Sequence, residues 1–239
     1  MIDTMMVHSV SSSTKNNAAR FSHNSIQGHF HSNFEISYAA DTNQIRWAMT
    51  VGCLMNPDGV AARYGSGIIL KRPILGCGVI VSSKGNYLII SDLHIPYHHR
   101  DAFSFLESVS EYYDCKVILN VGDMIDHHAG SYHESEPDAL SPEEEYYQSM
   151  EYCNELQDIF PSMIITEGNH DKIPQRKLKT CGLPASMVYD YNKLYKLDAK
   201  WKWVDKYTFN SNGGQPVLVP MVLNQKGRWN KKVHGSKVG

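Results

Sequence analysis

Three short stretches of the chain bring acidic, imidazole and amide side chains together at spacings that suit metal binding. They are Asp92-Leu93-His94, Gly122-Asp123-Met124-Ile125-Asp126 and Gly168-Asn169-His170-Asp171. In the first stretch the two polar residues stand at positions i and i+2, which face the same side of an extended chain. Carboxylate, imidazole and amide donors together suit divalent ions such as Mn²⁺, Fe²⁺, Zn²⁺ or Mg²⁺. Each stretch alone is a weak signal, but the three in this order indicate a metal site.

Each polar stretch follows a predicted strand. Short apolar runs predict strands at residues 87–91, 116–120 and 163–166. A helical pattern covers residues 101–114, and a second helix is predicted to begin with the capping box at Ser141 and to reach residue 161. This alternation predicts a parallel sheet, in which ligands gather beyond the carboxyl ends of the strands. The three polar stretches are therefore expected to meet at one edge of the sheet.

The flanking regions have a different pattern. Residues 26–82 and 201–223 alternate apolar and polar positions between turn residues, which predicts antiparallel strands and hairpins. Residues 12–22 are expected to form a short helix. Residues 82–86 have the composition of a simple linker.

With these motifs the chain resembles the calcineurin-like metallophosphoesterases. The pattern of that family runs Asp-x-His, Gly-Asp-x-x-Asp, Gly-Asn-His-(Asp/Glu), a lone His often followed by Gly, and finally Gly-His-x-His. His234-Gly235 matches the fourth element, and the fifth does not follow it before Gly239. The stretch Gly28-His29-Phe30-His31 matches the fifth element near the other end of the chain. The order of motifs is thus that of a circularly permuted family member.

The resemblance implies an α/β fold with a two-layer β-sandwich flanked by helices, in the order α/β/β/α. The expected unit is a single domain over residues 1–239. In permuted order, residues 1–81 would correspond to the C-terminal part of the family fold, residues 82–86 would bridge the old ends, and residues 87–239 would correspond to its N-terminal part. The new ends would open after His234, so Met1 and Gly239 are expected to lie near each other.

The resemblance also implies a centre of two divalent ions, with Mn²⁺ as the leading expectation and Fe, Zn, Mg or Ni as alternatives. The ligands implied for the first ion are Asp92, His94, Asp123 and His31. The ligands implied for the second ion are Asp123, which bridges the two, with Asn169, His234 and His29.

Two residues are the candidate catalytic groups. His170 resembles the histidine of the family that contacts phosphate and protonates the leaving oxygen. Asp171, or Asp126 in its place, is expected to orient a histidine through the second ring nitrogen. Weaker candidates for substrate binding are His98, His99, Arg176 and Lys177. For these four, a solvated loop or helix position is the alternative interpretation.

The implied function is metal-dependent hydrolysis of a phosphoester. The Gly-Asp-x-x-Asp motif is followed by His127-His128, where protein phosphatases have Arg-Gly, and Gly-Asn-His-Asp departs from their Gly-Asn-His-Glu. Both differences favour small phosphodiesters or nucleotides as substrates, with nucleic acid next. The chain also resembles the compact phosphoesterases that phages encode. The alternatives are a phosphomonoesterase, a non-catalytic binding module on the same fold, and a truncated or misassembled gene product.

Composition limits the class of protein further. Of the 239 residues, 42% are hydrophobic, which is enough to build a core. The formal net charge of −2 gives no overall field that would demand nucleic acid or an anionic membrane as partner. No apolar run approaches the ~18 residues of a membrane span, and the first residues lack the pattern of a secretory signal. A cytoplasmic protein is expected, in the host cell if a phage encodes it, and the oligomeric state stays open.

Overall fold

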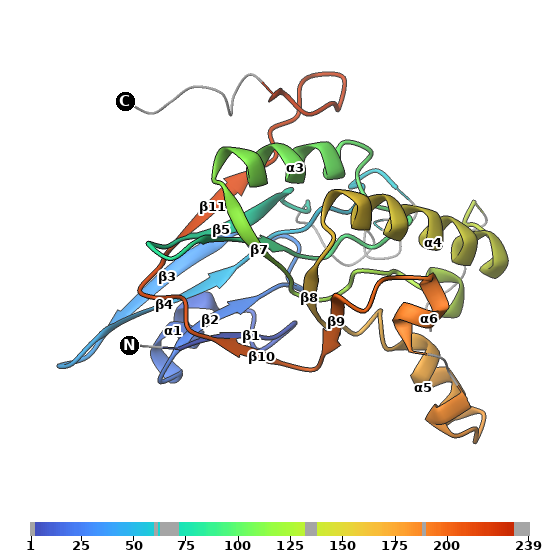
Figure 1. Cartoon of the computed structure of the whole chain (residues 1–239), viewed down its shortest axis with the longest axis horizontal. Helices are drawn as coiled ribbons and strands as arrows, with labels where there is room; N and C mark the ends of the chain where they lie inside the picture. Colours follow the sequence, from blue (N-terminus) through green and yellow to red (C-terminus); the bar gives the residue numbers. More distant parts are fainter. Residues whose placement is uncertain (1–2, 60–61, 63–71, 132–137, 188–189, 232–239) are drawn as a thin grey trace.

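The computed structural model describes residues 3–59, 62, 72–131, 138–187 and 190–231. Two mixed β-sheets lie face to face (Figure 1). The first sheet has five strands in the order β10 (Tyr207–Phe209), β1 (Thr4–Met6), β2 (Asn24–Gln27), β4 (Ile45–Thr50) and β3 (Glu35–Ala40). Strands β1, β2 and β4 are parallel to one another, and they run toward the same edge.

The second sheet has six strands. Their order is β11 (Gln215–Pro220), β5 (Gly76–Val81), β6 (Asn86–Ile90), β7 (Cys115–Asn120), β8 (Met163–Thr166) and β9 (Trp201–Val204). Strands β6 to β9 are parallel, whereas β5 and β11 pair in antiparallel fashion. The three strands predicted before the polar stretches are therefore confirmed as β6, β7 and β8, and they are neighbours in the sheet.

Helices cover both outer faces of the sandwich (Figure 1). Helices α3 (Ala102–Tyr112), α4 (Pro142–Ile159) and α6 (Tyr191–Tyr195) pack on the six-stranded sheet, and α1 (Thr14–Arg20) packs on β3 and β4. Helix α5 (Ile173–Thr180) projects from one end, and short 3₁₀ turns cover His128–Gly130 and Ala185–Met187. The predicted four-layer α/β/β/α architecture is confirmed. None of the described helices has the length and apolar character needed to cross a membrane.

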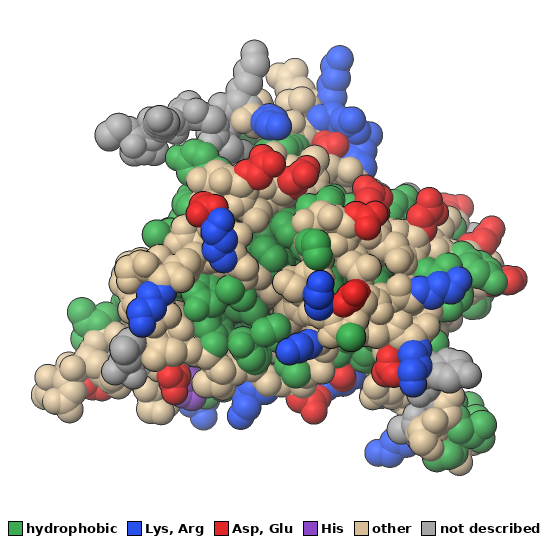
Figure 2. All heavy atoms as spheres, viewed as in Figure 1, with side chains coloured by type: hydrophobic (Ala, Val, Ile, Leu, Met, Phe, Trp, Pro, Cys, Tyr) green, Lys and Arg blue, Asp and Glu red, His purple; other side chains and the backbone are tan. Residues whose placement is uncertain are grey.

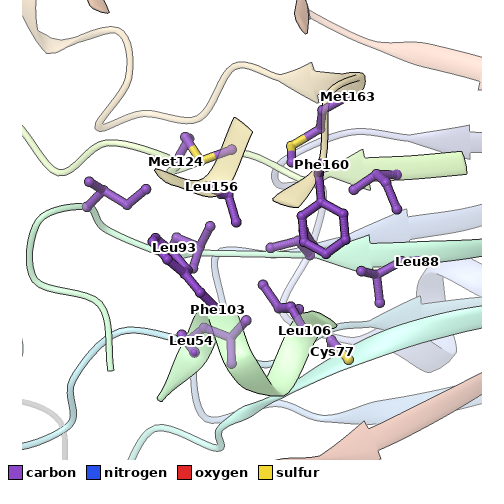
Figure 3. Close-up of a cluster of buried hydrophobic side chains, with 14 of the residues drawn as sticks. Leu54, Cys77, Leu88, Leu93, Phe103, Leu106, Met124, Leu156, Phe160 and Met163 are labelled. Carbon is purple, nitrogen blue, oxygen red and sulfur yellow. The ribbon is translucent and has the colours of Figure 1, made fainter. Parts of the chain in front are cut away.

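The core has two layers because the central strands are buried on both faces. On β6, Leu88 belongs to the cluster under α3 and α4, and the next residue, Ile89, belongs to the cluster between the sheets. Figure 3 shows the first cluster, in which Phe103 of α3 lies beside Leu93, and Leu106 of α3 lies beside Cys77. Burial on both faces explains why β6 has a continuous apolar run instead of alternation.

Helix α4 begins as its sequence predicts. The hydroxyl of Ser141 accepts a hydrogen bond from the amide of Glu144, and the carboxylate of Glu144 accepts one from the amide of Ser141. This capping box satisfies two amides that would otherwise lack partners at the helix start.

Pairing in the flanking regions is antiparallel as predicted for β3–β4, β5–β6 and β5–β11, and differs from the prediction at two places. Strand β2 pairs in parallel with β4, and β9 pairs in parallel with β8, where antiparallel strands were expected. Strand β1, for which the sequence made no prediction, also pairs in parallel with β2. All four residues of β2 are buried, so its sequence carries no alternation that would reveal the pairing. Residues 82–86 form the tight connection of the β5–β6 hairpin instead of a loose linker, with the amide of Ser82 donating to Asn86 Oδ1.

Candidate metal centre

The polar stretches meet where parallel strands of both sheets end. In the six-stranded sheet, β6 leads into Asp92, β7 into Asp123 and β8 into Asn169. In the five-stranded sheet, β1 leads into His8 and β2 into His29. The two sheets thus deliver ligand-type side chains to a common place from chain segments that lie far apart in the sequence.

A first cluster consists of His31, Asp92 and His94. The Nε2 atom of His31 lies 3.1 Å from Oδ1 of Asp92 and 3.3 Å from Nε2 of His94. His94 Nε2 also lies 4.0 Å from Oδ2 of Asp123. His31 therefore reaches the Asp-x-His motif, although 61 positions separate it from Asp92 in the chain.

A second cluster consists of His8, His29 and Asp123. The Nε2 atom of His8 lies 3.0 Å from Oδ2 of Asp123 and 3.1 Å from Oδ1 of Asn169. The rings of His8 and His29 are 5.2 Å apart between their centroids. Asp123 stands between the two clusters, because the same Oδ2 atom faces both His8 and His94.

The hydrogen bonds of the imidazole rings determine which nitrogen is available at the centre. His8 Nδ1–H donates to the carbonyl oxygen of Val121 at 2.7 Å, and His94 Nδ1–H donates to Oδ1 of Asp126 at 2.5 Å. With Nδ1 of each ring engaged in this way, Nε2 faces the oxygens of Asp123 and its neighbours. Imidazole nitrogens and carboxylate oxygens that converge in this way are donors that a divalent cation can use. This donor set fits a divalent metal ion.

The distances fit the same conclusion. Two ligand atoms that each lie about 2.1 Å from one ion, at angles between 90° and 110°, are separated by about 3.0–3.4 Å. The contacts that Nε2 of His8 and Nε2 of His31 make with neighbouring candidate ligands range from 3.0 to 3.3 Å. Two histidines and one aspartate in each cluster suit a borderline ion such as Mn²⁺, Fe²⁺ or Zn²⁺.

Burial makes the charges at this centre interact strongly. Asp92 is fully buried and Asp123 is 1% exposed. Burial alone would raise the pKa of Asp123, but the charge and hydrogen bond of His8 hold that pKa well below its usual range. Burial would likewise lower the pKa of His8, and the pull of Asp123 and Asp92 instead raises it to about 10. The carboxylates are therefore ionised and attract a positive charge to the space beside His8.

The backbone is strained at the residues that carry the candidate ligands. Asp92, His94 and Asp123 have positive φ angles of 48°, 51° and 47°, and His29 has 67°. Residues other than glycine seldom adopt this left-handed conformation, and such strain clusters at functional sites. Here it turns each side chain toward the centre at the end of a strand.

Two glycines of the motifs allow the loops to approach the ligands. A Cβ atom at Gly28 would lie 2.4 Å from Oδ2 of Asp92, and one at Gly168 would lie 2.0 Å from Oδ1 of Asp123. Because both positions are glycine, the amide of the nearby His29 can donate to Asp92, and the amide of the nearby His170 can donate to Asp123. The two motif glycines therefore have a steric role at the centre.

Asp126 takes the orienting role that the sequence leaves open between Asp126 and Asp171. Its Oδ1 atom accepts from His94 Nδ1 and lies 3.2 Å from Nδ1 of His170, which also donates to the Asp126 carbonyl oxygen at 2.8 Å. Burial would lower the pKa of His170, but Asp126 and Asp123 raise it to about 9. The two carboxylates therefore favour the protonated form of His170.

Asp171 is buried between the second and third motif loops. Its side chain is fully buried, and its two oxygens accept hydrogen bonds from the amides of Ile125 at 3.0 Å and Gly168 at 2.8 Å. Burial and the charge of Asp123 raise the pKa of Asp171. This carboxyl group ties the second motif loop to the third through backbone amides, and that Asp171 orients a histidine stays a prediction.

The weaker candidates also have other partners. His98 stacks on Phe103, with 4.5 Å between ring centroids, and His99 is bonded on both nitrogens, at Nε2 to the carbonyl oxygen of Gly227 and at Nδ1 to the amide of Asp101. A substrate-binding role of His98 and His99 stays a prediction beside these contacts. Arg176 and Lys177 lie on α5, which projects from the body of the fold (Figure 1).

His8 was not among the predicted ligands, whereas His234 was. His234 lies outside the described residues, as do Met1 and Gly239, so the expected closeness of the ends stays a prediction. His8 precedes His29 by 21 positions, and α1 and β2 lie between them. A helix and a strand are also what the family pattern leads us to expect between the lone His and Gly-His-x-His. That spacing was the signal for His8.

Comparison with known protein families agrees with this geometry. The family model of the calcineurin-like phosphoesterases matches residues 85–234. The chain belongs to this family. The residues that the family model matches include the first three motifs, while His8 and Gly28-His29-Phe30-His31 precede the matched range. No curated protein and no solved structure was found to match the chain.

The steric role of Gly168 leads to a prediction for stability. Gly168→Ala should lower the melting temperature of the phosphoesterase, because the new Cβ would also lie 2.4 Å from the backbone nitrogen of Asp123. Overpacking of this kind costs ~1–3 kcal/mol, or roughly 2–12 °C in a chain of this size. Gly130→Ala is the matched control, since its Cβ would meet only the end of the Ile173 side chain at 3.2 Å. Equal melting temperatures of the two variants by calorimetry would contradict the steric role.

Proposed function

We propose that this calcineurin-like phosphoesterase is a hydrolase with two divalent metal ions that cleaves small phosphodiesters. The observation that carries the proposal is the shared position of Asp123. One oxygen of this buried carboxylate faces His94 in the first cluster and His8 in the second. A bridging carboxylate between two sets of imidazole and oxygen donors is what a dinuclear centre requires.

In this proposal each ion has four protein ligands, and Mn²⁺ is the leading candidate for the metal. The first ion would be held by His31, Asp92, His94 and Asp123. The second ion would be held by His8, His29, Asn169 and Asp123. His8 thus takes the place that the sequence assigns to His234.

The chemistry would divide between the ions and His170. Two divalent ions at this centre would polarise the phosphoryl group and lower the pKa of a water molecule. His170 holds its Nδ1 proton against Asp126, so Nε2 is the nitrogen that would give a proton to the leaving oxygen. The raised pKa of His170, to about 9, keeps that proton in place at neutral pH. Asp126 contacts both His94 and His170, and so would position a metal ligand, His94, relative to the acid, His170.

The charges around the centre favour a diester over a monoester. A phosphomonoester dianion carries one more negative charge than a diester and needs additional cations. Lys172, which follows the third motif, already pairs with Asp205 at 2.6 Å and with Glu167 at 3.7 Å. The positions after Asp126 hold His127 and His128, and His128 is buried. This composition supports a substrate with a single negative charge.

His8 also changes the proposed point of permutation. If His8 is the lone His of the family pattern, the new ends open before that residue instead of after it. The chain would then begin with β1 and the lone His, continue through α1 and β2 to Gly-His-x-His, and pass through the β5–β6 hairpin to the Asp-x-His motif. The parallel pairing of β1, β2 and β4 supports this arrangement.

The proposed activity has a direct test. The purified protein should hydrolyse bis(4-nitrophenyl) phosphate when Mn²⁺ is present, lose the activity in EDTA and recover it when Mn²⁺ is restored. The measurement is release of nitrophenolate, with 4-nitrophenyl phosphate as the monoester comparison. If folded, metal-loaded protein cleaves neither ester, nor nucleotides or nucleic acid, the proposal is wrong.

The number of metal ions bound per chain tests whether His8 or His234 is a metal ligand. His8→Ala should reduce the bound metal from two ions per chain toward one, because the second cluster loses its best-placed nitrogen. His234→Ala should keep two ions. Plasma mass spectrometry of desalted protein measures both, and His8→Gln serves if the alanine variant does not fold. Loss of an ion from the His234 variant alone would return the ligand role to His234.

The proposed role of His170 as the acid predicts a loss of rate without a loss of metal. His170→Ala should keep both ions and reduce kcat by ~10²–10⁴-fold, which is the usual contribution of a positioned acid. The loss should be smaller for a nitrophenyl ester than for an alkyl ester, because nitrophenolate leaves without protonation. A variant that loses its metals, or that loses the same factor with both leaving groups, would show that His170 is not the acid.

A further inference from the structure

A groove lies between the two chain segments that leave the proposed metal centre at His8 and His29. The rings of these two residues are 5.2 Å apart. From them the chain continues as residues 12–15 on one side and as residues 30–35 on the other, and the space between has a volume of about 400 Å³. Pockets for small ligands fall in the range of about 300–1,000 Å³. The groove therefore has room for one organic group.

Phe30 is the apolar surface of this groove. It stands between His29 and His31 in the sequence, and its ring meets the ring of His29 edge-on at 5.0 Å. A tight turn fixes the residue, because the amide of Phe30 donates to the Gly28 carbonyl oxygen and the amide of Asn33 donates to the carbonyl oxygen of Phe30. The side chain is half-buried. A fixed aromatic ring at a groove is a surface on which planar groups stack.

The remaining walls of the groove are polar but balanced in charge. Ser12, Ser32 and Asn33 contribute neutral groups, with one cation from Lys15 and one carboxylate from Glu35. A second phosphate or a nucleic acid chain would require an excess of cations. A nucleoside is neutral, planar at one end and rich in hydroxyl groups at the other. The groove matches a nucleoside better than it matches a polyphosphate.

We propose that this groove binds the nucleoside half of a small phosphodiester, with the base stacked on Phe30. The inference rests on the proposed function for the position of the phosphate. It adds the substrate class, and it makes Phe30 a specificity-determining residue.

Two substrates with the same leaving group test the inference by kinetics. Thymidine 5′-(4-nitrophenyl phosphate) carries a nucleoside, whereas methyl 4-nitrophenyl phosphate does not. Phe30→Ala should reduce kcat/KM for the thymidine ester about ten-fold or more, as expected for loss of one stacked base, and should change the methyl ester less than three-fold. Phe30→Leu tests the aromatic face at similar bulk. Phe21→Ala is the matched control, since Phe21 stacks on His23 beyond the far end of α1.

Product binding provides a readout that does not need turnover. Calorimetry of the Mn²⁺-loaded protein should give tighter binding of thymidine 5′-monophosphate than of methyl phosphate, and Phe30→Ala should abolish the difference. If the thymidine product binds in this way but no diester is cleaved, the groove stands and the proposed function fails. If both esters are cleaved and Phe30→Ala affects them equally, the groove inference is wrong. Tighter, strongly salt-dependent binding of oligothymidylate would also overturn it in favour of nucleic acid.

Discussion

The buried carboxylate of Asp123 is the group on which the rest of the site depends. An ionised side chain with 1% exposure must be compensated by neighbours, because isolated charges are costly away from water. Here the compensation comes from both sheets: His8 follows β1, and the amide of His170 follows β8. The sandwich must close before Asp123 is satisfied, and the closed sandwich in turn positions every other ligand.

Tertiary contacts hold the strained backbone of the motif loops in place. The left-handed backbone at Asp92, His94 and Asp123 costs of order 1–3 kcal/mol for each residue. Asp171 offsets part of this cost by joining the loops after β7 and β8 through the amides of Ile125 and Gly168. The carboxylate of the third motif thus holds the two loops together through backbone amides.

The sequence predicts the central part of the fold well and the flanks poorly. Strands β6, β7 and β8 follow from continuous apolar runs, and α4 follows from its capping box, because these signals are local. Parallel pairing of β2 could not be predicted, since all four of its residues are buried and its partners are set by tertiary contacts. For the site, the motifs identify Asp92, His94 and Asp123, but His8 has no local signature. Only its spacing from His29 and its contacts to Asp123 single it out.

In the proposed centre two cations share Asp123, one beside His8 and one beside His94. The most direct measurement is the anomalous scattering of crystals grown with Mn²⁺, recorded near the manganese absorption edge. Two peaks are expected on either side of Asp123, one contacting Nε2 of His8 and the other contacting Nε2 of His94. A single peak, or peaks that leave His8 Nε2 bonded only to Asp123 and Asn169, would contradict the proposed centre.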